Sequence, residues 1–227
     1  MTITRTLRTT AATLALAGVT ALGFASQPLL ARDQTSVAEV LGAAPTTAPA
    51  TQDVNPAMWI VRDKDTTIYL FGTVHVLRPG LNWLKDDIKA AFDGSDELVL
   101  EVTEPEDPSI MPTILSKMAT NPAGTTLRSL LDAPVLAKYE SALGTLKIPA
   151  ASLDGYKPWF AAVTLTTVPL LMQGYDPNSG AEKVLSNAAK AQAKPVGQLE
   201  TIEQQLGIFN SLATKEQIAF LDVTLDG

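Results

Sequence analysis

The chain has 227 residues, of which 46% are hydrophobic and 6% aromatic, a composition typical of a folded protein rather than a disordered one. Its formal net charge of −7, with no long run of Lys and Arg, excludes the basic surface that nucleic-acid binding needs. The chain contains no cysteine, which excludes disulfides, thiolate metal sites and a cysteine nucleophile.

The first 25 residues have the order of a secretory signal peptide. Arg5 and Arg8 precede an uncharged stretch, rich in Ala and Leu, that ends in small residues. This order predicts an exported chain, periplasmic or extracellular, from which residues 1–25 are removed. The alternative is an uncleaved membrane anchor, because nothing from Thr9 to Ala31 is charged and roughly 20 such residues can span a bilayer.

Residues 26–56 are rich in Ala, Thr and Pro and predict a flexible linker. The folded domain is expected over residues 57–227. Its first two segments, 58–63 and 66–74, are rich in β-branched and aromatic residues and are separated by a polar Lys-Asp pair, which predicts an antiparallel hairpin.

A helix and a strand follow the hairpin. In residues 81–94, the apolar side chains of Leu84, Ile88 and Phe92 recur at helical spacing, and residues 97–102 form a short apolar run typical of a buried strand. This order predicts an α/β fold, in which a mixed β-sheet that starts with the hairpin is flanked by helices.

The middle of the chain, residues 104–150, alternates proline breaks with weakly amphipathic segments and predicts a helical insertion without chemistry of its own. Residues 158–175 carry no charge and contain Pro169, which predicts a buried, interrupted helix rather than a membrane span.

The last third predicts a helix over 178–193, a short strand over 194–199 and two further helices. Two Thr-x-x-Gln pairs predict capping boxes at the helix starts, one from Thr201 to Gln204 and one from Thr214 to Gln217.

Three ionisable residues fall at the predicted carboxyl ends of strands, where ligands of open α/β sheets usually bind. They are His75, the only histidine of the chain, Glu101 and Glu200. One imidazole with carboxylates could bind a divalent metal and activate water, or His75 could act in general acid/base catalysis with a carboxylate partner.

Each of these residues also has a structural interpretation, and a lone histidine after a strand is more often structural when judged without other information. Glu101 begins an acidic segment typical of a solvated loop, and Glu200 precedes a helix start, where negative charge favours the helix dipole. Asp176 fits a turn before a helix. The chain has no Gly-x-Ser-x-Gly, Walker or dinucleotide-binding motif.

Between Met58 and Leu212 the chain contains, in sequence, the motifs Gly-Thr-x-His, Leu-Val-Leu-Glu, Lys-Pro-Trp and Gly-x-Leu-Glu-Thr-x-x-Gln. The order of these four motifs resembles the TraB/GumN family of exported and membrane-associated proteins. The resemblance implies an α/β fold related to Tiki-type metal-dependent proteases and to the erythromycin-esterase and ChaN-like haem-binding proteins.

The resemblance also implies site residues. In that wider group the site uses two Gly-x-x-His motifs and a glutamate, and this chain matches the first motif with Gly72 and His75 and the glutamate with Glu101. A divalent metal would be held by His75 and Glu101, with Glu101 as a ligand or general base. Gly72, Asp176 and Glu200 would line the site.

The second Gly-x-x-His is absent, and the resemblance therefore implies a member that is truncated at the C-terminus, with a compromised metal site. The expected activity is metal-dependent hydrolysis of a peptide or amide bond. The alternatives are a non-catalytic envelope protein that binds haem, a metal or a peptide, and an accessory factor in envelope or exopolysaccharide production. The expected partner is a peptide or small molecule.

Overall fold

The computed structural model describes residues 51–105 and 107–226. The predicted signal peptide, the predicted anchor and the linker up to residue 50 lie outside the described residues. Two compact units make up the described chain: an α/β unit (51–103 and 174–199) and a helical unit (104–173 and 200–226).

The described residues confirm the predicted mixed α/β class, with eight α-helices and six strands. The strands form three two-stranded sheets instead of one continuous sheet. The pairs are β1 (Gln52–Asp53) with β4 (Leu81–Asn82), parallel; β2 (Met58–Arg62) with β3 (Thr67–Phe71), antiparallel; and β5 (Leu98–Leu100) with β6 (Val196–Gln198), parallel. Thus the last residues of the predicted linker, at β1, pair with β4.

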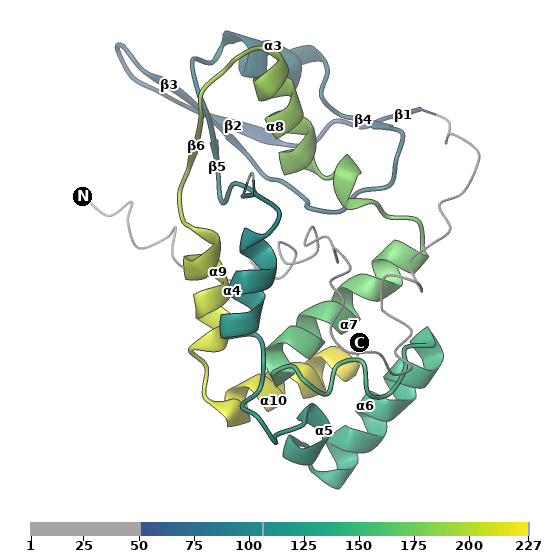
Figure 1. Cartoon of the computed structure of the whole chain (residues 1–227). Coiled ribbons are helices and arrows are strands. Elements are labelled where there is room, and N and C mark those ends of the chain that lie inside the picture. Colours follow the sequence, from purple (N-terminus) through teal and green to yellow (C-terminus); the bar gives the residue numbers. More distant parts are fainter. Residues whose placement is uncertain (1–50, 106, 227) are drawn as a thin grey trace. The chain divides into compact units, whose positions relative to one another are not determined.

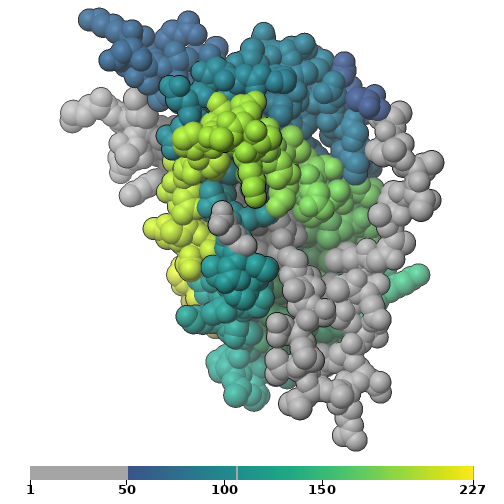
Figure 2. Space-filling view, turned by 45° about the horizontal axis from the view of Figure 1, so that its top comes forward, coloured from purple at the N-terminus to yellow at the C-terminus, as the bar shows by residue number. Residues whose placement is uncertain are grey.

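The predicted hairpin is confirmed as β2 and β3, paired from Met58 with Phe71 to Arg62 with Thr67. Its turn is closed by the Asp63 carboxylate, which accepts hydrogen bonds from the backbone N–H groups of Asp65 (3.2 Å) and Thr66 (2.9 Å). The hairpin forms a protrusion in Figure 2. Large apolar side chains on it are exposed: Trp59, Ile60, Val61, Ile68 and Leu70.

Helices α3 (Asp86–Gly94) and α8 (Ala181–Ala191) cover the core of the α/β unit (Figure 1). The predicted apolar faces of both helices point inward, because Phe92 and Leu185 are buried in one cluster with Trp83. Strand β5 contacts α8, and it runs parallel to β6. The carboxyl ends of β5 and β6 therefore lie at the same edge.

The helical unit is built around α7 (Pro158–Met172), whose side chains are buried on most sides. Helix α10 (Thr214–Leu225) lies beside α7 (Figure 1). The predicted buried helix is confirmed, but the predicted interruption is wrong, because Pro169 lies inside α7 and the helix continues to Met172. No helix in the described part of the chain is long and apolar enough to cross a membrane. The remaining helices are α4 (Ile110–Met118), α5 (Leu127–Leu130), α6 (Ala133–Leu146) and α9 (Ile202–Asn210).

One of the two predicted capping boxes is present. At α9, the Thr201 hydroxyl accepts from the Gln204 N–H (3.2 Å), and the Gln204 side chain accepts from the Thr201 N–H (2.8 Å). The box from Thr214 to Gln217 is wrong, because α10 has its N-cap at Ala213 and Thr214 is its first helical residue. Gln217 is buried instead, and its amide donates to the Leu212 carbonyl (2.8 Å).

Candidate functional site

The candidate site lies in the α/β unit around His75. Strand β3 ends at Phe71, so His75 is four residues beyond the strand rather than directly after it. The imidazole is largely buried, with 18% of the side chain exposed. A buried imidazole is usually hydrogen-bonded, so the residue that contacts it is part of the same site.

That partner is Glu182, in the first turn of α8. Its Oε1 lies 3.1 Å from Nδ1 of His75, and the Thr73 hydroxyl donates a hydrogen bond to the same oxygen. The Glu182 side chain is 15% exposed, and its Oε2 is buried with no hydrogen-bond partner among the described residues. The site therefore contains a buried imidazole–carboxylate pair.

Sequence reasoning missed Glu182, because it followed only the apolar face of the helix over 178–193. An acidic residue in the first turn of a helix is common, since it favours the helix dipole. The available signal was the position of Glu182 directly after the turn that contains Asp176, which was itself a candidate.

Asp176 acts at this turn as a structural residue. Its carboxylate Oδ1 accepts from the backbone N–H of Asn178 (2.8 Å) and so caps the short helix η2 (Pro177–Ser179). Its backbone exchanges two hydrogen bonds with Leu77, of 2.9 and 3.4 Å. Asp176 thereby fixes the segment after His75 beside the segment that leads into α8.

Gly180 allows these two segments to approach closely. A Cβ atom at this position would overlap the backbone carbonyl group of His75, lying 2.7 Å from its carbon. In addition, the N–H of Ala181 donates to the carbonyl of Val74 (3.0 Å). Only glycine leaves room for this contact, which places the start of α8 against the His75 backbone.

The charges of the site favour an ion pair. Burial by itself lowers the pKa of His75, but the hydrogen bond and charge of Glu182, with the charge of Glu101, outweigh it and raise that pKa above its ordinary value. Burial raises the pKa of Glu182, but its bonds to His75 and Thr73 outweigh this effect and hold the pKa below its ordinary value. Both residues therefore favour their charged forms.

Glu101 follows β5 directly and acts on His75 through its charge. The structure thus brings two predicted residues, His75 and Glu101, into one electrostatic environment. Gly72 is exposed, and a Cβ atom there would meet nothing within 4 Å, so the described residues contain no steric reason for a glycine. Glu200 belongs to the helical unit, where it is half-buried and precedes the cap of α9.

The predicted metal ligands are His75 and Glu101. Across residues 51–105 and 107–226, no group of three or more His, Asp or Glu side chains that could hold a metal ion is found. The carboxylates that act on His75 are Glu182, whose Oε1 lies 3.1 Å from Nδ1, and Glu101, which acts through its charge.

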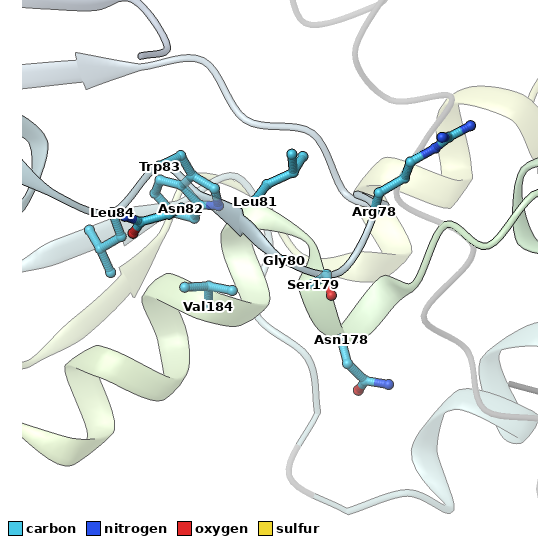
Figure 3. Close-up of a pocket in the computed structure, with 9 residues that line it drawn as sticks. All are labelled: Arg78, Gly80, Leu81, Asn82, Trp83, Leu84, Asn178, Ser179 and Val184. Carbon is cyan, nitrogen blue, oxygen red and sulfur yellow. The ribbon is translucent and has the colours of Figure 1, made fainter. Parts of the chain in front are cut away.

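A pocket of about 270 Å³ lies elsewhere in the α/β unit (Figure 3). Its walls include Leu81, Trp83 and Val184, whereas the side chains of Arg78 and Asn178 point away from Trp83. The polar groups therefore do not converge on one point. None of the site residues around His75 lines this pocket. The candidate site is therefore the imidazole–carboxylate pair and not the pocket.

The fold and the site define a mixed α/β protein with a histidine–carboxylate pair next to its β-strands. Residues 57–227 match the TraB/PrgY/gumN family. The chain therefore belongs to this family, as the order of its motifs predicted. No curated protein and no solved structure matches the chain significantly.

Proposed function

We propose that this protein is an exported member of the TraB/PrgY/gumN family that hydrolyses peptide or amide bonds, with His75 as the proton acceptor. The observation that carries the proposal is the 3.1 Å contact between Nδ1 of His75 and Oε1 of Glu182. A largely buried imidazole held by a carboxylate is the arrangement that general acid/base catalysis requires.

In the proposed reaction, neutral His75 accepts a proton from a water molecule as that water attacks the scissile carbonyl. The imidazolium that forms is stabilised by the carboxylate of Glu182 and by the charge of Glu101, both of which favour the protonated ring. The same proton then passes to the leaving amine. Glu101 contributes through charge in this scheme, which retains its place in the predicted site.

The metal-dependent form of the proposal assigns a divalent ion to His75 and Glu101. It is weaker than the metal-free form, because the described residues provide fewer than three grouped ligands. Every step above is therefore assigned to side chains of the chain itself. Addition and removal of metal distinguish the metal-dependent form from the metal-free form.

Export is proposed from the N-terminal sequence alone. The charged, apolar and small-residue regions of residues 1–25 are the three parts of a signal peptide. N-terminal sequencing of the protein secreted or transferred to the periplasm would identify the cleavage site, and an uncleaved, membrane-bound chain would instead support an anchor.

Hydrolysis can be tested on the full chain with a library of fluorogenic peptides. We expect His75→Ala to lower the rate by roughly 10²–10⁴-fold, which is the usual contribution of a general base. Lys64→Ala, in the exposed hairpin turn, is the control and should retain the wild-type rate. Equal rates for the wild-type and His75→Ala chains would refute the assignment of His75.

A second candidate function, non-catalytic peptide binding, is favoured by the hairpin. Strands β2 and β3 pair only with each other among the described residues, and their apolar side chains are exposed. An extended peptide could add to such an edge through backbone hydrogen bonds. Trp59 is 61% exposed, whereas Trp83 and Trp159 are buried. A blue shift in tryptophan emission on adding a peptide of alternating Val and Thr, absent in Trp59→Phe, would support binding.

A further inference from the structure

The contact between Glu182 and His75 bears on the proton that His75 carries. A glutamate is ordinarily ionised at neutral pH, and an ionised carboxylate can only accept hydrogen bonds. The 3.1 Å contact therefore requires a proton on Nδ1 of His75. When the imidazole is neutral it has one N–H, so Nε2 is then the nitrogen with the free electron pair.

The position of Glu182 is fixed from several directions. Its Oε1 also accepts from the Thr73 hydroxyl, two residues before His75. Its helix is attached to the same segment through the bond from Ala181 to Val74 and through the close approach of Gly180 to the backbone of His75. The carboxylate cannot move away from the imidazole unless these contacts also change.

The unpartnered Oε2 of Glu182 also indicates that the carboxylate is held beside the imidazole. A buried carboxylate oxygen without a hydrogen-bond donor is unfavourable, and a site that serves only stability would be expected to satisfy it. The helix start and the two donors to Oε1 keep the carboxylate in place in spite of this cost.

We propose that Glu182 is the positioning residue of the site: it holds the His75 ring with Nδ1–H directed at its carboxylate and leaves Nε2 as the basic atom. The inference rests on the proposed function only for the identity of the group from which Nε2 takes a proton. The tautomer itself is a property of the resting protein, and the hydrogen bond made by one ring nitrogen decides which nitrogen carries the proton.

The tautomer can be measured directly, because the full chain has only one histidine. In a long-range ¹H–¹⁵N spectrum, recorded at a pH where the ring is neutral, one imidazole gives one set of signals. We expect the wild-type chain to show a protonated Nδ1 and an unprotonated Nε2. A wild-type spectrum with the proton on Nε2 would overturn the inference.

Two variants then separate positioning from simple helix stabilisation. Glu182→Met keeps the approximate size of the side chain but removes the oxygen that accepts from Nδ1–H, so the spectrum should shift towards Nε2–H. Glu203→Met is the matched control, because Glu203 is the second residue of α9, as Glu182 is of α8, and it is exposed. It should leave the tautomer unchanged. If Glu182→Met retains the wild-type tautomer, Glu182 does not select it.

The same variants distinguish this inference from the proposed function. If the wild-type ring has the Nδ1–H form and Glu182→Met changes it, the inference holds even when no peptide is cleaved, and only the proposed function fails. If cleavage depends on His75 but the tautomer does not depend on Glu182, the function holds and the inference fails. With both intact, Glu182→Met should lower the cleavage rate more than it changes the KM.

Discussion

One oxygen of Glu182 lies 3.1 Å from Nδ1 of His75 and accepts a hydrogen bond from the hydroxyl of Thr73, although the glutamate lies on a distant segment of the chain. This relationship joins the loop after β3 to the start of α8. It makes the only histidine of the chain dependent on a helix that sequence reasoning treated as purely structural.

The first prediction concerns pH and stability. The pKa of His75 is raised above its ordinary value of 6.5, so its charged form stabilises the fold below that pH, and the contribution is lost as pH rises through the folded value. The pKa of Glu182 is lowered below its ordinary 4.5, so its contribution is present above that pH and lost as pH falls through the folded value. The pair is therefore strongest between these two ordinary values.

Urea unfolding of the wild-type and His75→Gln chains measures this pair. We expect the difference in unfolding free energy to be larger near pH 5.5 than near pH 8.5, by about 1 kcal/mol, because hydrogen bonds between charged groups are stronger than neutral ones. A difference that grows as pH rises from 5.5 to 8.5 would contradict the assigned directions of the two pKa values.

The second prediction concerns Gly180. Glycine to alanine should destabilise the chain by about 1–3 kcal/mol, because the added Cβ would overlap the carbonyl group of His75 and force the backbone apart. Gly72→Ala is the control, since its Cβ would meet nothing within 4 Å, and its effect should be about 0.5 kcal/mol or less. Chemical denaturation of both variants compares them, and equal losses of stability would argue against the close approach.

The third prediction concerns the core of the helical unit. Trp159 is fully buried and stacks on Phe209, with ring centroids 5.8 Å apart. Trp159→Ala should lower the unfolding free energy by about 3–5 kcal/mol, because it leaves a large cavity. Trp59→Ala removes the same side chain from an exposed position and should change it by about 0.5 kcal/mol or less. Circular dichroism during denaturation follows both without relying on tryptophan emission.

The fourth prediction concerns metal. Because the proposed steps use only the side chains of the chain itself, EDTA should leave the melting temperature and any peptide cleavage unchanged. A ligand that binds only the folded chain raises its melting temperature, so zinc is a direct probe. A rise with zinc that disappears in both His75→Ala and Glu101→Gln would instead establish the metal-dependent form of the proposed function.

Local patterns were sufficient for much of the secondary structure. The hairpin from Met58 to Phe71 was predictable because β-branched and aromatic residues surround a short polar turn. The cap at Thr201 was also predictable, because both of its hydrogen bonds join residues three positions apart. The Thr214 box failed because the same spacing is met one residue earlier, where Glu216 accepts from the Ala213 N–H (2.9 Å).

The sequence by itself determined the family and the class of fold, because these depend on the order of motifs and on short-range periodicity. Tertiary structure decided the pairing of strands into three separate sheets, the structural role of Asp176 and the partner of His75. These depend on contacts between segments far apart in the chain. Helical periodicity marks which face of α8 is apolar, but only packing places Glu182 against the imidazole.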